Sequence, residues 1–200
     1  MNTELILNTN IQNIAAIYGG ARGTTLSSRH NMRHWQTIVD SGVCTIIELR
    51  DEDHSDRLCK MCETYGIGYF AFPLDSHSVP NELIASRLQQ FFELVDNGDF
   101  YIACAMGLHR TDMALAIYWI FHGAENGMNP PILRGHVADG ELVLDRLNNK
   151  VFRRLNSLYA YLMNNNVIPV PAPETFAQRK RDLIDFNRLQ LTINNHITNI

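Results

Sequence analysis

Residues 100–111 (FYIACAMGLHRT) combine a cysteine, a glycine-containing loop and an arginine in a pattern that suits an oxyanion. The apolar run before Cys104 predicts a buried strand, and the run after Arg110 predicts a helix. Backbone N–H groups of a tight loop can surround an anion, and a helix N-terminus adds its partial positive charge. Arg110 can bind two oxygens of one anion with its planar guanidinium, and Gly107 permits torsions that other residues resist. The segment therefore predicts an anion site in the loop.

Cys104 would stand at the base of this loop, where the same positive field acts on its thiol. The thiolate is the nucleophilic form of cysteine, and a helix N-terminus with a nearby cation stabilises it. Thr111 could donate a hydrogen bond to the sulfur and help to hold it ionised. These residue types predict nucleophilic catalysis, in which two easier displacements replace one difficult displacement.

Strands and helices are predicted to alternate around this segment. Short apolar or β-branched runs predict strands at residues 15–18, 43–49, 69–72 and 100–103. Amphipathic or apolar runs predict helices at 31–40, 53–65, 80–97, 111–121, within 141–163 and at 174–191. This order favours an α/β domain with a mainly parallel central sheet flanked by helices. Residues 1–166 are predicted to form the domain, and residues 167–200 a proline-rich connector with a C-terminal helical extension.

Composition excludes several classes of protein. The 200-residue chain is 46% hydrophobic and 19% charged, which is ordinary for one folded domain. Its formal charge of −4 gives no general attraction to nucleic acid. No apolar run reaches the roughly 18 residues of a membrane span, and the first thirty residues lack the pattern of a secretory signal. We expect a cytoplasmic protein; the sequence leaves its oligomeric state open.

The order Cys104-x5-Arg110-Thr111, with Gly107 third after the cysteine, resembles the signature of the protein tyrosine and dual-specificity phosphatases. The elements from Ile17 to Gly123 follow the order of that superfamily, and residues 18–21 (YGGA) and 42–50 (GVCTIIELR) are similar to its compact atypical dual-specificity members. Residues 107–111 (GLHRT) are similar to a fungal and plant branch, some of which act on inositol phosphates. The resemblance implies a phosphotyrosine-phosphatase-like fold. It also implies hydrolysis of phosphomonoesters through a phosphocysteine, without metal or cofactor.

The resemblance also implies roles for particular residues. In the superfamily, an aspartate on a mobile loop well before the cysteine protonates the leaving oxygen, and Asp75 in the run FPLD has that place and context. The implied catalytic residues are Cys104, Arg110, Asp75 and Thr111. The implied phosphate-binding loop consists of Ala105, Met106, Gly107, Leu108, His109 and Arg110. The expected partner is a phosphorylated protein or a small phosphomonoester.

Three residues depart from the superfamily pattern and keep alternatives open. Ala103 stands where histidine is usual, so a catalytically weak phosphate-binding module is one alternative. Leu108 stands where the inositol-phosphate branch tends to carry lysine. Phosphotyrosine or mixed protein phosphomonoesters are therefore favoured over the other alternative, inositol phosphates or phosphoinositides. Asp112 replaces a small residue; it favours the helix N-terminus but would weaken anion binding if it faced the site.

Other clusters have plainer interpretations. Cys59 and Cys62 form a CxxC pair, but no second pair exists to complete a zinc site, so buried packing is favoured. The basic residues of 22–34 could reach the anion site: Arg22, Arg29, His30, Arg33 and His34. The run Arg179-Lys180-Arg181 is interpreted as a solvated helix face.

Overall fold

The computed structural model describes residues 1–26, 32–50, 55–74, 79–138, 141–142 and 150–198. The chain divides into two compact units, Met1–Thr111 and Asp112–Ile200. The two units are described in turn. The predicted division between residues 166 and 167 stays a prediction.

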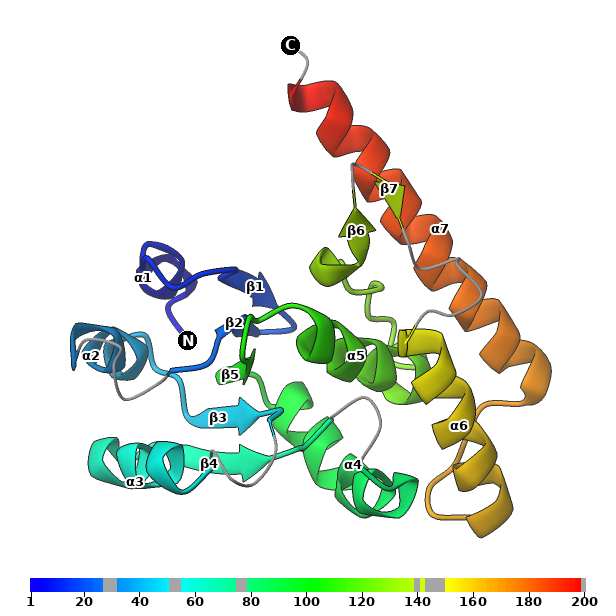
Figure 1. Cartoon of the computed structure of the whole chain (residues 1–200), viewed down its shortest axis with the longest axis horizontal. Helices are drawn as coiled ribbons and strands as arrows, with labels where there is room; N and C mark the ends of the chain where they lie inside the picture. The colour runs from blue at the N-terminus through cyan, green and yellow to red at the C-terminus, as the bar shows by residue number, and fades with distance from the viewer. Residues whose placement is uncertain (27–31, 51–54, 75–78, 139–140, 143–149, 199–200) are drawn as a thin grey trace. The chain divides into compact units, whose positions relative to one another are not determined.

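The first unit is built on a five-stranded sheet with the order β1-β2-β5-β3-β4 (Figure 1). Its strands are β1 (Ala15–Ile17), β2 (Gly20–Thr24), β3 (Thr45–Glu48), β4 (Gly68–Ala71) and β5 (Phe100–Cys104). The four strands β2, β5, β3 and β4 are parallel, and β1 is antiparallel to β2. The carboxyl ends of the parallel strands therefore meet at one edge, where Cys104 ends the central strand.

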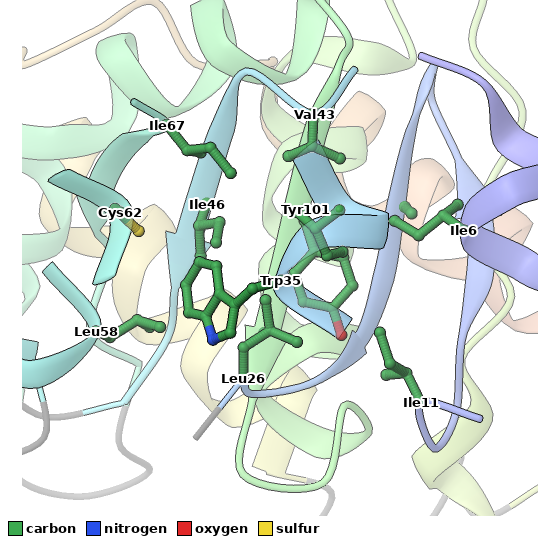
Figure 2. Close-up of a cluster of buried hydrophobic side chains, with 13 residues drawn as sticks. Ile6, Ile11, Leu26, Trp35, Val43, Ile46, Leu58, Cys62, Ile67 and Tyr101 are labelled. Atoms are coloured by element: carbon green, nitrogen blue, oxygen red, sulfur yellow. The ribbon is translucent and has the colours of Figure 1, made fainter. Parts of the chain in front are cut away.

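Three helices of the first unit cover one face of this sheet: α1 (Thr3–Leu7), α2 (Met32–Asp40) and α3 (Ser55–Tyr65). Figure 2 shows the cluster they bury, with Ile6 from α1, Trp35 from α2 and Cys62 from α3 gathered against Ile46 and Tyr101 of the sheet. Trp35 is fully buried and its ring stacks on Tyr65, with centroids 5.5 Å apart. The apolar spacing that predicted α2 thus marks a core-facing side.

The opposite face of the sheet is also buried. Side chains alternate along a strand, so Ile47 and Ile102 point away from the cluster that holds Ile46 and Tyr101, and both are fully buried. α4 (Asn81–Asp96) buries one side that includes Phe91, whose ring stacks on Phe72 with centroids 4.3 Å apart. Burial on both faces explains why the strands have nearly continuous apolar runs.

The sequence analysis missed strand β2, which begins at Gly20, shortly after the predicted strand at residues 15–18. Tyr18 and Gly19 have φ of 48° and 76° and form the two-residue turn of a β1–β2 hairpin. β2 (GARGT) has no apolar run, because its glycines lie where bulky side chains approach. A Cβ at Gly20 would lie 2.6 Å from the Phe100 ring, and one at Gly23 would lie 2.4 Å from the Tyr101 hydroxyl.

The second unit is mostly helical. It contains most of α5 (His109–Tyr118), a π-helical turn at Trp119–Gly123, α6 (Lys150–Asn165) and α7 (Pro173–Thr198). A short 3-10 turn (Arg134–His136) precedes a two-stranded sheet of β6 (Val137–Ala138) and β7 (Glu141–Leu142). Within the predicted helical range 141–163, the structure has α6 from Lys150 onward, and Glu141–Leu142 form a strand. α7 begins at Pro173, as the proline preference for a first turn allows.

Packing within the second unit corrects the interpretation of the basic run. Arg179 is buried, and its guanidinium donates to the Ile120 carbonyl and to Glu125. Tyr159 of α6 stacks on Phe176 of α7, with centroids 4.0 Å apart. Arg179 is therefore a structural residue of the unit, and not part of a solvated face. In the part of the chain that the structure describes, no helix has the length and apolar character needed to cross a bilayer.

We predict that Gly23→Ala lowers the free energy of unfolding by about 1–3 kcal/mol, because the new methyl overlaps the Tyr101 hydroxyl in a full core. In a Tyr101→Phe background the same change is expected to cost less, since the overlapping oxygen is gone. Urea denaturation of the four proteins in this double-mutant cycle measures the coupling. Strictly additive costs would show that the two groups do not compete for space.

Candidate active site

Cys104 is the last residue of the central strand. All five residues of β5 are buried, and Cys104 is 4% exposed. The chain then turns, and α5 begins at His109, two residues earlier than the sequence predicted. The carboxyl end of a parallel strand followed by a helix N-terminus is the usual place for an anion site in an α/β sheet.

Thr111, in the first turn of α5, donates a hydrogen bond from Oγ1 to the Cys104 sulfur over 3.3 Å. The Thr111 side chain is fully buried. The contact joins the two ends of the predicted loop, so the loop between them is closed. This is the geometry that the sequence analysis expected for Cys104 and Thr111; their catalytic roles stay predictions.

The loop between Cys104 and α5 turns sharply at Gly107. Gly107 has φ of 64°, and its N–H donates to the Cys104 carbonyl over 3.1 Å. A Cβ at this position would lie 2.3 Å from the carbonyl carbon of Gly23. The predicted glycine requirement therefore has two causes, a left-handed torsion and contact with the backbone of β2.

The other loop residues differ in exposure. Ala105, Met106 and His109 are exposed, whereas Leu108 and Arg110 are half-buried. Met106 has 54% of its surface exposed, which is high for a large apolar side chain. The loop thus presents apolar groups to the solvent beside Arg110.

Arg22 is the member of the predicted basic cluster that the structure brings to the loop. It is 2% exposed, and its Nη2 donates to the Gly107 carbonyl over 2.9 Å. His34 instead contacts Asn10. Arg29 and His30 lie outside the described residues, as does the side chain of Arg33.

Sequence analysis missed a buried carboxylate network beside Cys104. Glu48, at the end of β3, is fully buried. Its carboxylate accepts hydrogen bonds from Thr25 Oγ1 (2.8 Å) and Arg50 Nε (2.8 Å). The Thr25 N–H in turn donates to the Cys104 carbonyl over 2.9 Å. The available signal was the pair Glu48 and Arg50 in the run IIELR, since two charged residues at the end of a buried strand need partners.

Ala103, at the position where the sequence analysis noted a departure from the superfamily pattern, is fully buried on the face of the sheet that holds Tyr101. Its register partners are Gly23 on β2 and Glu48 on β3. The residue before Cys104 therefore lies between Gly23 and the paired carboxylate of Glu48.

Asp112 is fully buried within the second unit. Its Oδ2 accepts a hydrogen bond from the Gly135 N–H over 2.6 Å. The carboxylate therefore has a structural partner that the sequence analysis did not foresee.

Asp75 lies outside the described residues, but the chain leading to it is described. The Phe72 N–H donates to the Glu48 carbonyl over 2.8 Å, and the Leu74 N–H donates to the Leu49 carbonyl over 3.2 Å. The Leu49 N–H donates to the Ala103 carbonyl over 2.9 Å. The chain before Asp75 therefore leaves the sheet at the same edge as Cys104.

Cys62 of the CxxC pair packs as the sequence analysis favoured, whereas Cys59 is only half-buried. Cys62 is fully buried in the cluster of Figure 2, and burial raises its pKa to about 12. A thiol with so high a pKa stays protonated near neutral pH. Within the described ranges, no group of three or more His, Cys, Asp or Glu side chains is placed to hold a metal ion.

No family model matches the chain, and the search of curated proteins found no relative. Solved structures do match its fold. A DUF442 protein from Shewanella putrefaciens CN-32, whose description as a phosphatase is provisional, is 17% identical with a TM-score of 0.53, over 79% of this chain and 97% of its own.

Two further structures match at lower TM-score. The catalytic domain of the PP-IP phosphatase SIW14 from S. cerevisiae is 14% identical with a TM-score of 0.47, over 82% of this chain and 99% of its own. A cysteine-to-serine form of TpbA from P. aeruginosa, bound to phosphotyrosine, is 14% identical with a TM-score of 0.42, over 88% and 98%. The predicted fold class is confirmed: the chain has a phosphotyrosine-phosphatase-like α/β fold with a mainly parallel central sheet and a C-terminal helix.

Proposed function

We propose that this protein hydrolyses phosphomonoesters without a metal ion, through a phosphocysteine formed on Cys104. One observation carries the proposal: the Cys104 sulfur, at the end of the central strand, accepts a hydrogen bond from Thr111 in the first turn of α5. A hydrogen bond to a charged form favours that form, so this contact supports a thiolate at the base of an anion-binding loop. The fold shared with the Shewanella protein supports the same class of enzyme.

The reaction proceeds in two displacements. The Cys104 sulfur attacks phosphorus, the bond to the leaving oxygen breaks, and Asp75 gives that oxygen a proton. Asp75 then takes a proton from water, the water oxygen attacks phosphorus, and the sulfur–phosphorus bond breaks to release inorganic phosphate. Arg110 and the loop N–H groups stabilise the charge on the other phosphoryl oxygens in both transition states.

The path of the chain supports Asp75 as the proton donor. The backbone bond from Leu74 to Leu49 holds the residue before Asp75 at the carboxyl edge of the sheet. Leu49 in turn bonds to Ala103, the neighbour of the nucleophile. Asp112 is a weaker candidate, because its buried carboxylate already accepts the Gly135 N–H.

The exposed groups of the loop favour a phosphotyrosine or mixed protein phosphomonoester over a polyphosphorylated inositol. Ala105 and Met106 are exposed and apolar, and Leu108 is half-buried. An aromatic leaving group can contact such a surface, whereas every additional phosphate of an inositol needs its own donors or stays in water. The cytoplasmic location expected from the sequence stays a prediction.

The first test separates an enzyme from a binding module. Cys104→Ser is expected to abolish release of phosphate from a chromogenic aryl phosphate, measured with a chelator present, while binding of inorganic phosphate survives. Arg110→Ala is expected to lose both. Cys44→Ser is the matched control, because Cys44 is exposed and away from the loop in sequence, and it should keep full activity. Turnover that persists in Cys104→Ser would refute the mechanism. Phosphate binding without turnover in the wild type would identify a binding module.

The second test locates the general acid. Asp75→Asn is expected to slow hydrolysis of ordinary esters by about 10²–10⁴-fold, with a smaller loss for very good leaving groups. The wild-type rate should fall at high pH, because rising pH removes the proton of the acid. This fall on the basic side of the pH–rate profile, the basic limb, should flatten in Asp75→Asn. Asp112→Asn keeps an acceptor oxygen for the Gly135 N–H and should keep the limb. If Asp112→Asn flattens the limb instead, the assignment of Asp75 is wrong.

The third test concerns substrate charge. A phosphotyrosine peptide is expected to exceed a panel of inositol polyphosphates in kcat/KM at moderate salt. Leu108→Lys should reduce the difference in kcat/KM between the two kinds of substrate, because it adds a cation to the loop. Leu108→Gln should leave that difference unchanged. A tenfold preference for inositols, about 1.4 kcal/mol of transition-state stabilisation, would favour the inositol phosphate alternative.

A further inference from the structure

Two consecutive carbonyl oxygens of the loop are held by side chains from the N-terminal part of the first unit. The Gly107 carbonyl accepts from Arg22 Nη2 over 2.9 Å, and the Met106 carbonyl accepts from Asn13 Nδ2 over 2.8 Å. Neither donor belongs to the cysteine–arginine motif. Arg22 lies on β2, and Asn13 lies two residues before β1. The β1–β2 hairpin and the residues that lead into it therefore place both donors at the loop.

The orientation of a carbonyl fixes the orientation of the following N–H. The peptide group is planar and almost always trans, so its C=O and N–H point in opposite directions. The bond from Arg22 to the Gly107 carbonyl therefore directs the Leu108 N–H away from Arg22. The bond from Asn13 to the Met106 carbonyl likewise directs the Gly107 N–H, which donates to the Cys104 carbonyl and closes the turn.

The β1–β2 hairpin and the loop pack so closely that no water molecule fits between Gly107 and Gly23. Gly107 packs directly on the backbone of Gly23, the residue after Arg22. Arg22 is 2% exposed, so its positive charge is poorly screened where it meets the loop. A loop that binds an anion benefits from both effects, since the carbonyl oxygens would otherwise repel phosphate.

We propose that Arg22 and Asn13 are positioning residues of the phosphate-binding loop, which hold the Gly107 and Met106 carbonyls turned away from the bound phosphate. The Leu108 N–H is then oriented before phosphate arrives, while the Gly107 N–H keeps the turn closed. This inference rests on the proposed function, because it assumes that the loop binds a phosphoryl group.

A purely structural arginine provides the comparison. Arg179 is also buried and also donates to a backbone carbonyl, that of Ile120, but it belongs to the second unit. Arg22→Met and Arg179→Met therefore remove similar bonds, and both are expected to lower the Tm. Only Arg22→Met is expected to change the affinity for phosphate in the folded protein.

The experiment measures binding of inorganic phosphate by calorimetry to the full chain carrying Cys104→Ser, and the Tm of each variant. Adding Arg22→Met should weaken binding about tenfold or more, and Arg22→Lys should recover part of the loss by keeping one donor and the charge. Asn13→Gly removes the amide at a residue whose φ is 58°, a torsion that glycine adopts freely. It should weaken binding about threefold. Arg179→Met should leave binding unchanged.

The outcomes separate the two claims. If the Cys104→Ser protein binds phosphate and the Arg22 and Asn13 variants bind it equally well, the inference is wrong and the proposed function stands. If the Cys104→Ser protein binds no phosphate and the wild type hydrolyses no aryl phosphate, the proposed function fails and the inference fails with it. Should Arg22→Met not fold, Arg22→Lys and the surface variant Asn13→Gly decide the question.

Discussion

The close approach of two glycines, Gly107 of the loop and Gly23 of β2, is the constraint on which the site depends. A Cβ on Gly107 would lie 2.3 Å from the Gly23 carbonyl carbon, and a Cβ on Gly23 would lie 2.4 Å from the Tyr101 hydroxyl. Neither residue has room for a side chain, so the loop can lie directly on the strand. This contact brings Arg22 within hydrogen-bonding distance of the loop and keeps Cys104 at its base.

Among the described residues, the carboxylate of Glu48 on the neighbouring strand is paired, and the Arg22 guanidinium contacts the loop that follows Cys104. Glu48 lies one strand away with no solvent exposure, and it is held by Arg50 and Thr25. An unpaired carboxylate there would oppose both a thiolate and a bound phosphate. The Arg50–Glu48 ion pair would therefore protect the proposed anion site as well as the core. The Thr25 N–H connects the same network to the Cys104 carbonyl.

Features that depend on neighbouring residues could be predicted from the sequence, and features that depend on distant pairing could not. The strand before Cys104, the turn at Gly107 and the helix after it follow from local apolar patterning and glycine torsions. The strand β2 has no such pattern. Its glycines are needed because the side chains of Phe100 and Tyr101 occupy the space next to them, and that contact exists only in the folded sheet. Arg22 and Gly107 are 85 residues apart, and sequence spacing alone offers no reason to pair them.

The same distinction bears on the replacement of histidine by Ala103. The motif supplies Cys104 and Arg110, but three carbonyls are held from outside the motif: that of Cys104 by Thr25, that of Met106 by Asn13 and that of Gly107 by Arg22. A side chain at position 103 is therefore not the sole means of fixing the loop. Ala103 itself fits a buried site between Gly23 and Glu48, where a larger polar ring would need space and partners. We infer that the hairpin and the Thr25–Glu48 pair provide the rigidity that a phosphatase loop requires, so the alanine alone does not argue for an inactive protein.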